Sequence, residues 1–242
     1  MPLPRVVLPE TLDALAEDDP RAIRSRRDLR RVNRVMGTRA IMLRGLADVV
    51  APRARGTALR VLEPGAGDGS LMLALAEKLS VSWPAVELTL LDRQRLVSAE
   101  TLSGFARLGW KAKSLNVDML DWIATPALQR WDVIATNLFL HHFDDRRLPD
   151  VLRGIGERCD YFFACEPRRT RLPLIASHLI GAIGANAVTR EDAVLSVHAG
   201  FRGDELATLW PRDTGDWRLA EYSAGLFSHC LRAVRSGPMK AE

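Results

Sequence analysis

The sequence predicts a doubly wound α/β fold: a mostly parallel seven-stranded sheet with an antiparallel last strand and helices on both faces. Three observations carry this prediction. From Leu59 onward, short β-rich runs alternate with helical stretches, as in a parallel sheet covered by helices. A glycine-rich turn, Gly65 to Gly69, follows the first of these runs. The chain then ends in two adjacent strand-like runs, and their short link requires them to be antiparallel.

Length and composition favour one large domain, or one domain with a small appendage. The chain has 242 residues, of which 47% are apolar and 26% charged, so it can bury a sizeable core and is not a disordered protein. Its three cysteines, Cys159, Cys165 and Cys230, form no CxxC pair. We therefore expect no disulfide framework, no metal site and a reducing, cytoplasmic location.

No targeting or membrane-spanning segment is expected. Residues 1–20 mix one arginine with five acidic residues, so the basic start of a secretory signal is missing. The most apolar stretch, 172–188, is interrupted by glycine, serine, histidine and asparagine. It also falls short of the roughly 20 residues that a membrane helix needs.

Arginine is concentrated in residues 21–60, which hold 12 arginines against two aspartates. A basic arm can bind nucleic acid through its phosphates, which is one open alternative. The other is a solvated helix face, because apolar residues such as Leu29 and Val32 recur near helical spacing between the arginines. We expect this arm to belong to an N-terminal helical lid, residues 1–57.

The elements follow in chain order. Glycine and proline separate them, strand-like runs are short, and helical runs keep an apolar face. Residues 58–242 form the sheet domain, with an insertion over about 168–202 between the fifth and sixth strands. Helices are expected over 20–36, 38–51, 69–80, 97–108, 145–158, 171–184 and 203–210, and strands over 59–63, 86–91, 111–117, 131–136, 161–165, 217–223 and 226–234.

The turn after the first strand carries the main functional signal. It reads Val61-Leu-Glu63-Pro-Gly65-Ala-Gly67-Asp-Gly69-Ser70. Glycines at alternate positions let the backbone bend sharply and approach a ligand closely. The dinucleotide fingerprint needs a further glycine where this chain has Ser70. A carboxylate at Glu63 also suits a cationic amino group better than a pyrophosphate, which it would repel.

The chain at this point resembles the class I S-adenosylmethionine-dependent methyltransferases. Thr89-Leu-Leu-Asp92 resembles the second motif of that family, Asn116-Val-Asp118-Met119 the third, and the segment from Trp131 to His142 the fourth. The resemblance covers about 59–234 and includes the terminal pair of strands, which matches the reversed seventh strand of the family's sheet. Each motif is weak alone, but four in order at the right spacing are specific.

The resemblance implies S-adenosylmethionine as cofactor and gives each motif a role. Glu63 would hold the amino group of the cofactor, Asp92 the ribose hydroxyls and Asp118 the adenine amino group. An arginine of the lid, Arg34, would neutralise the cofactor carboxylate. The expected cofactor-binding residues are Glu63, Gly65, Ala66, Gly67, Asp92, Arg93, Asp118, Met119, Asn137 and Arg34.

The segment after the fourth strand indicates a small-molecule acceptor. Nucleic-acid amino-methyltransferases of this class clamp a flipped base with two prolines, which Asn137-Leu-Phe-Leu140 lacks. The chain is instead similar to ubiquinone- and menaquinone-type enzymes and natural-product O-methyltransferases, which implies a phenol, quinol or polyketide-like acceptor. The insertion would line the acceptor pocket, with His178, His198 and Phe201 as substrate-binding residues.

His141 and His142 are the expected catalytic bases. Both follow directly on the fourth strand and titrate near neutrality, and a base assists the loss of the hydroxyl proton. One of them could instead only cap the next helix. Deprotonation of a ring hydroxyl would also support methylation at a ring carbon. O- and C-methylation therefore both remain open, as do a monomer and a homodimer.

Overall fold

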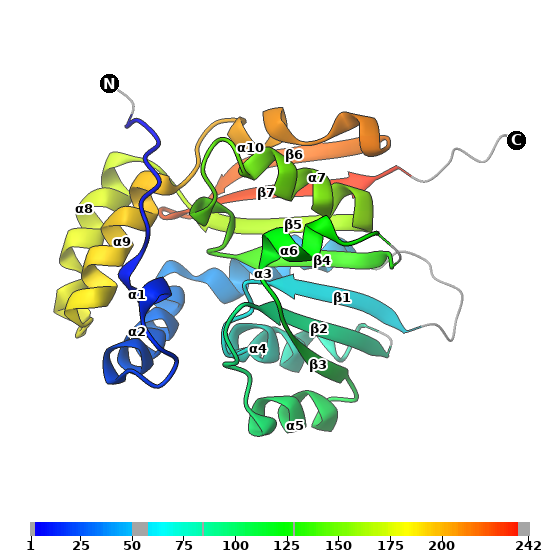
Figure 1. Ribbon diagram of the computed structural model, residues 1–242, viewed down its shortest axis with the longest axis horizontal. Coiled ribbons are helices and arrows are strands. Elements are labelled where there is room, and N and C mark those ends of the chain that lie inside the picture. Colours follow the sequence, from blue (N-terminus) through cyan, green and yellow to red (C-terminus); the bar gives the residue numbers. More distant parts are fainter. Residues whose placement is uncertain (1–2, 50–57, 84, 128, 237–242) are drawn as a thin grey trace, which may run out of the picture.

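The computed structural model describes residues 3–49, 58–83, 85–127 and 129–236, and its centre is a seven-stranded sheet (Figure 1). The strands lie in the order β3-β2-β1-β4-β5-β7-β6, and β7 runs antiparallel to both of its neighbours while β1–β5 are parallel. This confirms the predicted sheet with its reversed last strand. The strands are β1 (Leu59–Pro64), β2 (Val86–Asp92), β3 (Lys111–Asn116), β4 (Trp131–Asn137), β5 (Cys159–Pro167), β6 (Trp217–Ala224) and β7 (Ser228–Arg235).

Helices cover both faces of the sheet and bury a separate apolar cluster on each. Successive strand residues point to opposite faces, so Val61 of β1 joins one cluster and Leu62 joins the other. One face is covered by α3 (Thr38–Leu46), α4 (Ser70–Leu79) and α5 (Ala99–Arg107), and the other by α6 (Met119–Ala124), α7 (Leu148–Arg158) and α10 (Glu205–Leu209).

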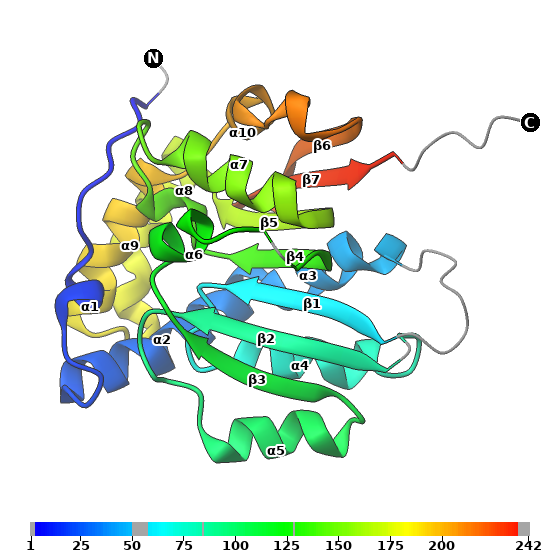
Figure 2. The ribbon, with the colours of Figure 1, turned by 45° about the vertical axis from the view of Figure 1, so that its right-hand side comes forward.

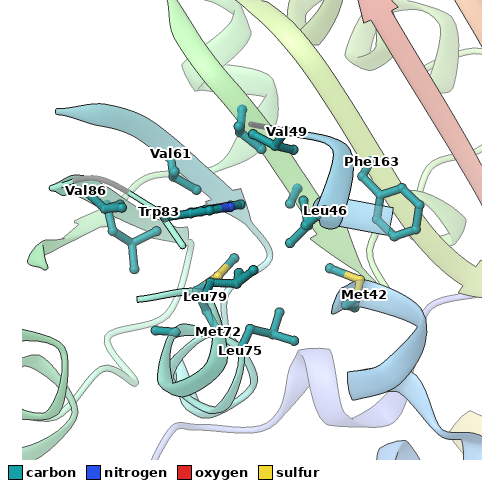
Figure 3. Packing of buried hydrophobic residues seen from close by; sticks show 14 of the residues in the cluster. Met42, Leu46, Val49, Val61, Met72, Leu75, Leu79, Trp83, Val86 and Phe163 are labelled. Atoms are coloured by element: carbon teal, nitrogen blue, oxygen red, sulfur yellow. The ribbon is translucent and has the colours of Figure 1, made fainter. Parts of the chain in front are cut away.

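Helix α3 belongs to the sheet layer and not to a lid. Its residues Met42 and Leu46 are fully buried and lie near Phe163 of β5 (Figure 3). Gly45 permits this approach, since a Cβ there would lie 2.2 Å from the Phe163 ring. The segment expected as a lid therefore divides after α2. Helix α3 ends at Leu46 and a 3₁₀ turn reaches Val49, while 50–57 lie outside the described residues.

A helical cap stands beyond the carboxyl ends of the parallel strands (Figures 1 and 2). It combines the N-terminal arm with the insertion at 168–202. Asp28 is buried, and its Oδ2 accepts the backbone N–H of Asn186 at 2.8 Å. The Asn186 side chain in turn caps the following helix by accepting the N–H of Thr189 at 2.8 Å. The helices of the cap are α1 (Thr11–Ala14), α2 (Pro20–Met36), α8 (Arg171–Leu179) and α9 (Ala187–Ala199).

Three helices, α1, α6 and α9, were not predicted from the sequence. Helix α9 contacts α1, α2 and α8, so its apolar residues are spread around the helix and give no single-faced pattern. The helix expected over 171–184 ends at Leu179 and continues as a 3₁₀ turn to Ile183. Helix α7 begins three residues later than expected, because the Asp144 side chain accepts the N–H of Arg147 at 2.9 Å in the turn before it.

Two further expectations concern membrane-spanning helices and the cysteines. Within the described ranges, no helix combines the length and the apolar character needed to cross a membrane. The three cysteines, Cys159, Cys165 and Cys230, are buried free thiols.

Candidate functional site

A cavity of about 740 Å³ lies between the carboxyl ends of the strands and the N-terminal segment. Ligands of open α/β sheets bind in this position because loops after the parallel strands meet there. Several parts of the chain line it: the N-terminal strap (residues 3–14), helix α2, the glycine turn after β1, the segments after β2 and β3, the loop after β4, and helix α9. The predicted residues Asp92, Arg93, Asp118, Met119, His141 and His142 are among the lining residues.

The glycine turn after β1 serves two purposes. Gly65 and Gly67 have positive φ angles of 68° and 55°, which favour glycine. A Cβ at Gly65 would lie 2.4 Å from the Phe139 ring, whereas a Cβ at Gly67 would meet no atom within 4 Å. Gly65 therefore admits the Phe139 ring, and Gly67 leaves open space at the cavity wall. The latter is the close-approach position that the sequence motif predicts.

Two adjacent strands end in buried oxygens that have no hydrogen-bond partner among the described residues: Glu63 Oε2 on β1 and Asn137 Oδ1 on β4. Glu63 is only 3% exposed. Burial raises its pKa well above the usual range, and the negative charges of Asp68 and Asp92 raise it further. A cationic group bound nearby would reverse this effect. These oxygens are therefore suited to hold an ammonium.

The acids after β2 and β3 differ in their surroundings. Asp92 Oδ2 accepts the N–H of Gly67 at 2.8 Å and Oδ1 accepts that of Gln94 at 2.9 Å. Burial raises the pKa of Asp92, although these two hydrogen bonds oppose the rise. Asp118 is exposed and caps α6 by accepting the N–H of Leu120 at 2.8 Å. Its carboxylate thus has a structural role in addition to its place at the cavity.

His141 is held between two carboxylates. Its Nδ1 lies 2.8 Å from Glu166 Oε2 and its Nε2 lies 3.3 Å from Glu10 Oε1. Glu166 is fully buried and also accepts the backbone N–H groups of Phe139 and Leu140 at 3.0 and 2.9 Å. Burial alone would lower the pKa of His141, but the bonds to Glu10 and Glu166 raise it to about 9. Its ring therefore carries a proton on each nitrogen at neutral pH.

His142 lies against His141, with ring centroids 4.3 Å apart. Its Nδ1 is 3.4 Å from Asp13 Oδ2, and its side chain is 27% exposed. Burial and the positive charge of His141 lower the pKa of His142, so this imidazole is neutral at neutral pH. The two adjacent histidines thus differ in charge, which the sequence could not show.

The N-terminal strap, residues 3–14, brings Glu10 and Asp13 to the cavity. Arg5 ties it down by donating to the carbonyls of Ala199 at 2.9 Å and Phe143 at 2.8 Å. The first N–H groups of α1 donate to Asp192 on α9 at 2.8 and 2.9 Å. Burial alone would raise the pKa of Glu10, but the hydrogen bond from His141 and the charges of the two histidines lower it to about 2. Glu10 therefore meets the histidines as a carboxylate.

Comparison with known proteins identifies the architecture. No protein-family model matches the sequence, and no curated protein does. The plantazolicin methyltransferase BpumL, solved with SAH, has a TM-score of 0.61 at 13% identity, over 90% of this chain and 92% of its own. An O-methyltransferase family protein from Burkholderia thailandensis has a TM-score of 0.61 at 15% identity, over 95% of this chain and 64% of its own. The mitomycin 7-O-methyltransferase MmcR has a TM-score of 0.55 at 23% identity, over 93% of this chain and 60% of its own. The chain has the class I methyltransferase fold.

In this methyltransferase fold, several predicted residues lie away from the cavity. Arg34 is exposed on α2 and His178 is exposed on α8, while His198 is half-buried and does not line the cavity. Phe201 is 1% exposed in the core, with the Arg5 guanidinium 4.7 Å from its ring centroid. The insertion therefore contributes Ser196 to the cavity wall, and not the residues that the sequence analysis expected there.

The structure adds residues that the sequence analysis missed. Arg26 of α2 lines the cavity, and its Nη1 is buried without a hydrogen-bond partner in the described part of the chain. Glu10 and Asp13 arrive on the strap, and no local pattern marks them. Glu166 gave one usable signal: it is a carboxylate at the carboxyl end of a strand beside the strand that leads to the histidines.

Proposed function

We propose that the protein transfers a methyl group from S-adenosylmethionine to a small molecule, at the hydroxyl of a phenol, quinol or polyketide-like compound. One observation carries this proposal: Gly67, with its open space, and the two histidines line one cavity, and the unpaired Glu63 lies at the end of the strand that leads into the glycine turn. The methyltransferase fold supports it, as do the S-adenosyl ligands solved with its structural neighbours.

The residues present fit this cofactor, which when bound supplies an electrophilic methyl group on a sulfonium. Glu63 and Asn137 would hold the ammonium with their unpaired oxygens. Asp92 would accept from the ribose hydroxyls, and Asp118 from the adenine amino group. Arg26 replaces Arg34 as the partner of the cofactor carboxylate, because Arg26 reaches the cavity and carries an unpaired buried nitrogen.

The acceptor would lie between the N-terminal strap and the loop after β4. Val7, Leu8 and Leu12 supply apolar surface from the strap, and Phe139 and Phe143 supply it from the loop after β4. The two phenylalanine rings pack edge to face, with centroids 5.2 Å apart. A wall of this kind suits a flat aromatic acceptor, and orientation of the two reactants can contribute about 7–11 kcal/mol to catalysis.

We assign His142 to remove the acceptor proton. Both ring nitrogens of His141 already face carboxylates, Glu166 and Glu10. His142 is more exposed and lines the cavity. The sequence analysis named both histidines as candidate bases, and this assignment selects His142.

Nucleic-acid binding by the arginine-rich arm is less well supported. Four of its arginines pair with acids of the same chain: Arg21 with Asp19, Arg30 with Asp68, Arg31 with Asp28 and Arg39 with Glu77. Such pairs lower the charge that the arm can offer to phosphates. The small-molecule acceptor is therefore the function that we carry forward.

The test is methyl transfer from isotopically labelled S-adenosylmethionine to a panel of phenols and quinols, followed by mass spectrometry. We expect a labelled product, and fragmentation places the methyl on oxygen or on a ring carbon. The His142→Ala variant should lower kcat by roughly 10²–10⁴, whereas His178→Ala, an exposed histidine outside the cavity, should match the wild type. Cofactor binding without turnover across the panel would contradict methyl transfer to phenols and quinols and leave the chain as a cofactor-binding module.

A further inference from the structure

Glu10, His141 and His142 bring one carboxylate and two imidazoles together at the cavity wall. One ligand atom of each lies within 4.8 Å of the other two. We infer that these three side chains form a binding site for a divalent metal ion of the zinc or cobalt type. The sequence analysis expected no metal because the three cysteines form no CxxC pair. Glu10 is instead brought by the strap from 131 residues before His141.

The spacing of the donor atoms fits such an ion. Tetrahedral coordination with bonds of about 2.0–2.1 Å to imidazole and carboxylate places neighbouring ligand atoms roughly 3.3–3.4 Å apart. His141 Nε2 and Glu10 Oε1 are 3.3 Å apart. The widest pair, at no more than 4.8 Å, needs to close by about 1.4 Å at most, which a turn of the half-buried His142 ring can supply.

Glu166 completes the arrangement from behind. Its Oε2 is 2.8 Å from His141 Nδ1, so the imidazole presents Nε2 toward Glu10. A carboxylate that orients a ligating histidine through its second nitrogen is a regular companion of metal sites. Backbone N–H groups of Phe139 and Leu140 fix Glu166 itself. The buried half of the site is therefore already in place before any ion binds.

The ligand set determines the ion and leaves room for a fourth ligand. Two imidazoles and one carboxylate favour zinc, cobalt or nickel over magnesium or calcium. All three residues line the cavity, so an open coordination position would face the acceptor. An ion there would lower the pKa of a bound hydroxyl and replace His142 as the means of deprotonation. This role, unlike the site itself, rests on the proposed methyl transfer.

The experiment titrates Co²⁺ into the full chain after chelator treatment, with visible absorption as the readout. We expect one Co²⁺ per chain, with the strong visible bands of four- or five-coordinate cobalt, and displacement by Zn²⁺. Glu10→Gln and His142→Ala should each weaken Co²⁺ binding by at least about 100-fold. Matched controls are Glu17→Gln, on the same N-terminal segment, and His178→Ala, and both should bind as the wild type does.

Two results would overturn the site: no Co²⁺ bound by the wild type, or equal affinity in Glu10→Gln, His142→Ala and the controls. Either would leave the cluster as a hydrogen-bonded ion group that fastens the strap. Cobalt binding needs neither cofactor nor acceptor, so it tests the site separately from methyl transfer. The turnover of chelator-treated protein, with and without added Zn²⁺, then shows whether the ion takes part in the reaction.

Discussion

Two buried glutamates, Glu166 at the end of β5 and Glu63 at the end of β1, stand on either side of β4 in contrasting surroundings. Glu166 accepts three backbone N–H groups and the ring of His141. Glu63 has one oxygen without a partner among the described residues. Its neighbours Asp68 and Asp92 add negative charge. The chain satisfies one carboxylate completely and leaves the other unbalanced.

The contrast separates scaffold from ligand site. A buried charge is costly unless it is paired and hydrogen-bonded, so Glu166 is stable in the chain as it stands. The buried carboxyl group of Glu63 is favourable only when it is protonated or when a cation lies beside it. The surroundings of Glu63 are thus suited to a bound cation, whereas Glu166 is fully paired within the chain.

The largest expected effect is the loss of stability in the Glu166→Gln variant. An amide would turn an N–H donor toward groups that already donate, and His141 would keep only Glu10 as a counter-charge. Breaking a buried pair in this way costs about 3–5 kcal/mol, and we expect that loss in the free energy of unfolding, measured by urea denaturation at neutral pH. A loss below about 1 kcal/mol would mean that Glu166 does not hold the histidine loop.

The matched change Glu63→Gln should act in the opposite direction. Because the folded pKa of Glu63 is raised well above its ordinary value of 4.5, the cost of ionising it is absent below about pH 4.5 and grows as pH rises toward the folded pKa. The ligand-free variant should therefore gain stability over the wild type between about pH 5 and pH 8, by roughly 1–3 kcal/mol. It should also bind S-adenosylhomocysteine more weakly.

Urea unfolding across this pH range provides the measurement. A difference between variant and wild type that does not change with pH would show that Glu63 is not the titrating group. Stronger binding of S-adenosylhomocysteine by the variant would separate Glu63 from the cofactor ammonium, whatever its effect on stability.

A smaller effect distinguishes the glycine turn from ordinary glycine strain. Gly67→Ala and Gly109→Ala both place a side chain at positive φ, 55° and 79°, with no atom within 4 Å of the new Cβ. Each should lose about 1–2 kcal/mol of stability. Of these two glycines, Gly67 lines the cavity and Gly109 does not. Gly67→Ala should therefore also weaken S-adenosylhomocysteine binding in calorimetry, and Gly109→Ala should not. Equal affinities in the two variants would contradict the close approach of the cofactor to Gly67.

The sheet could be predicted because its signals are local. Alternating strand and helix patterns, a glycine turn and a tight terminal pair of strands predict a mostly parallel sheet with an antiparallel last strand. The expected cofactor-binding residues also rest on local signals, since Gly67, Asp92 and Asp118 each follow a predicted strand. What the sequence hides is the cap, because α9 packs on three sides and carries no single apolar face.

The acceptor side could not be predicted for a related reason. Glu10 and His141 meet across 131 residues, and the meeting depends on Arg5 and Asp192 fastening a strap that has almost no regular structure. Identical neighbouring residues, His141 and His142, acquire different charges from contacts that only the folded chain supplies. Phe201 was expected in the pocket because it lies in the insertion, and it is in fact part of the core.

The smallest predicted effect compares two arginines of one helix. Arg26 lines the cavity with an unpaired buried nitrogen, whereas Arg34 is exposed. Hydrogen bonds to charged groups contribute about 1.5–3 kcal/mol, and solvent near the cavity mouth reduces this value. We therefore expect Arg26→Ala to weaken S-adenosylhomocysteine binding roughly tenfold, and Arg34→Ala to leave it unchanged. Adenosine, which lacks the carboxylate, should bind both variants as it binds the wild type. A parallel loss of adenosine affinity in Arg26→Ala would show that the arginine shapes the cavity as a whole and does not pair with the carboxylate.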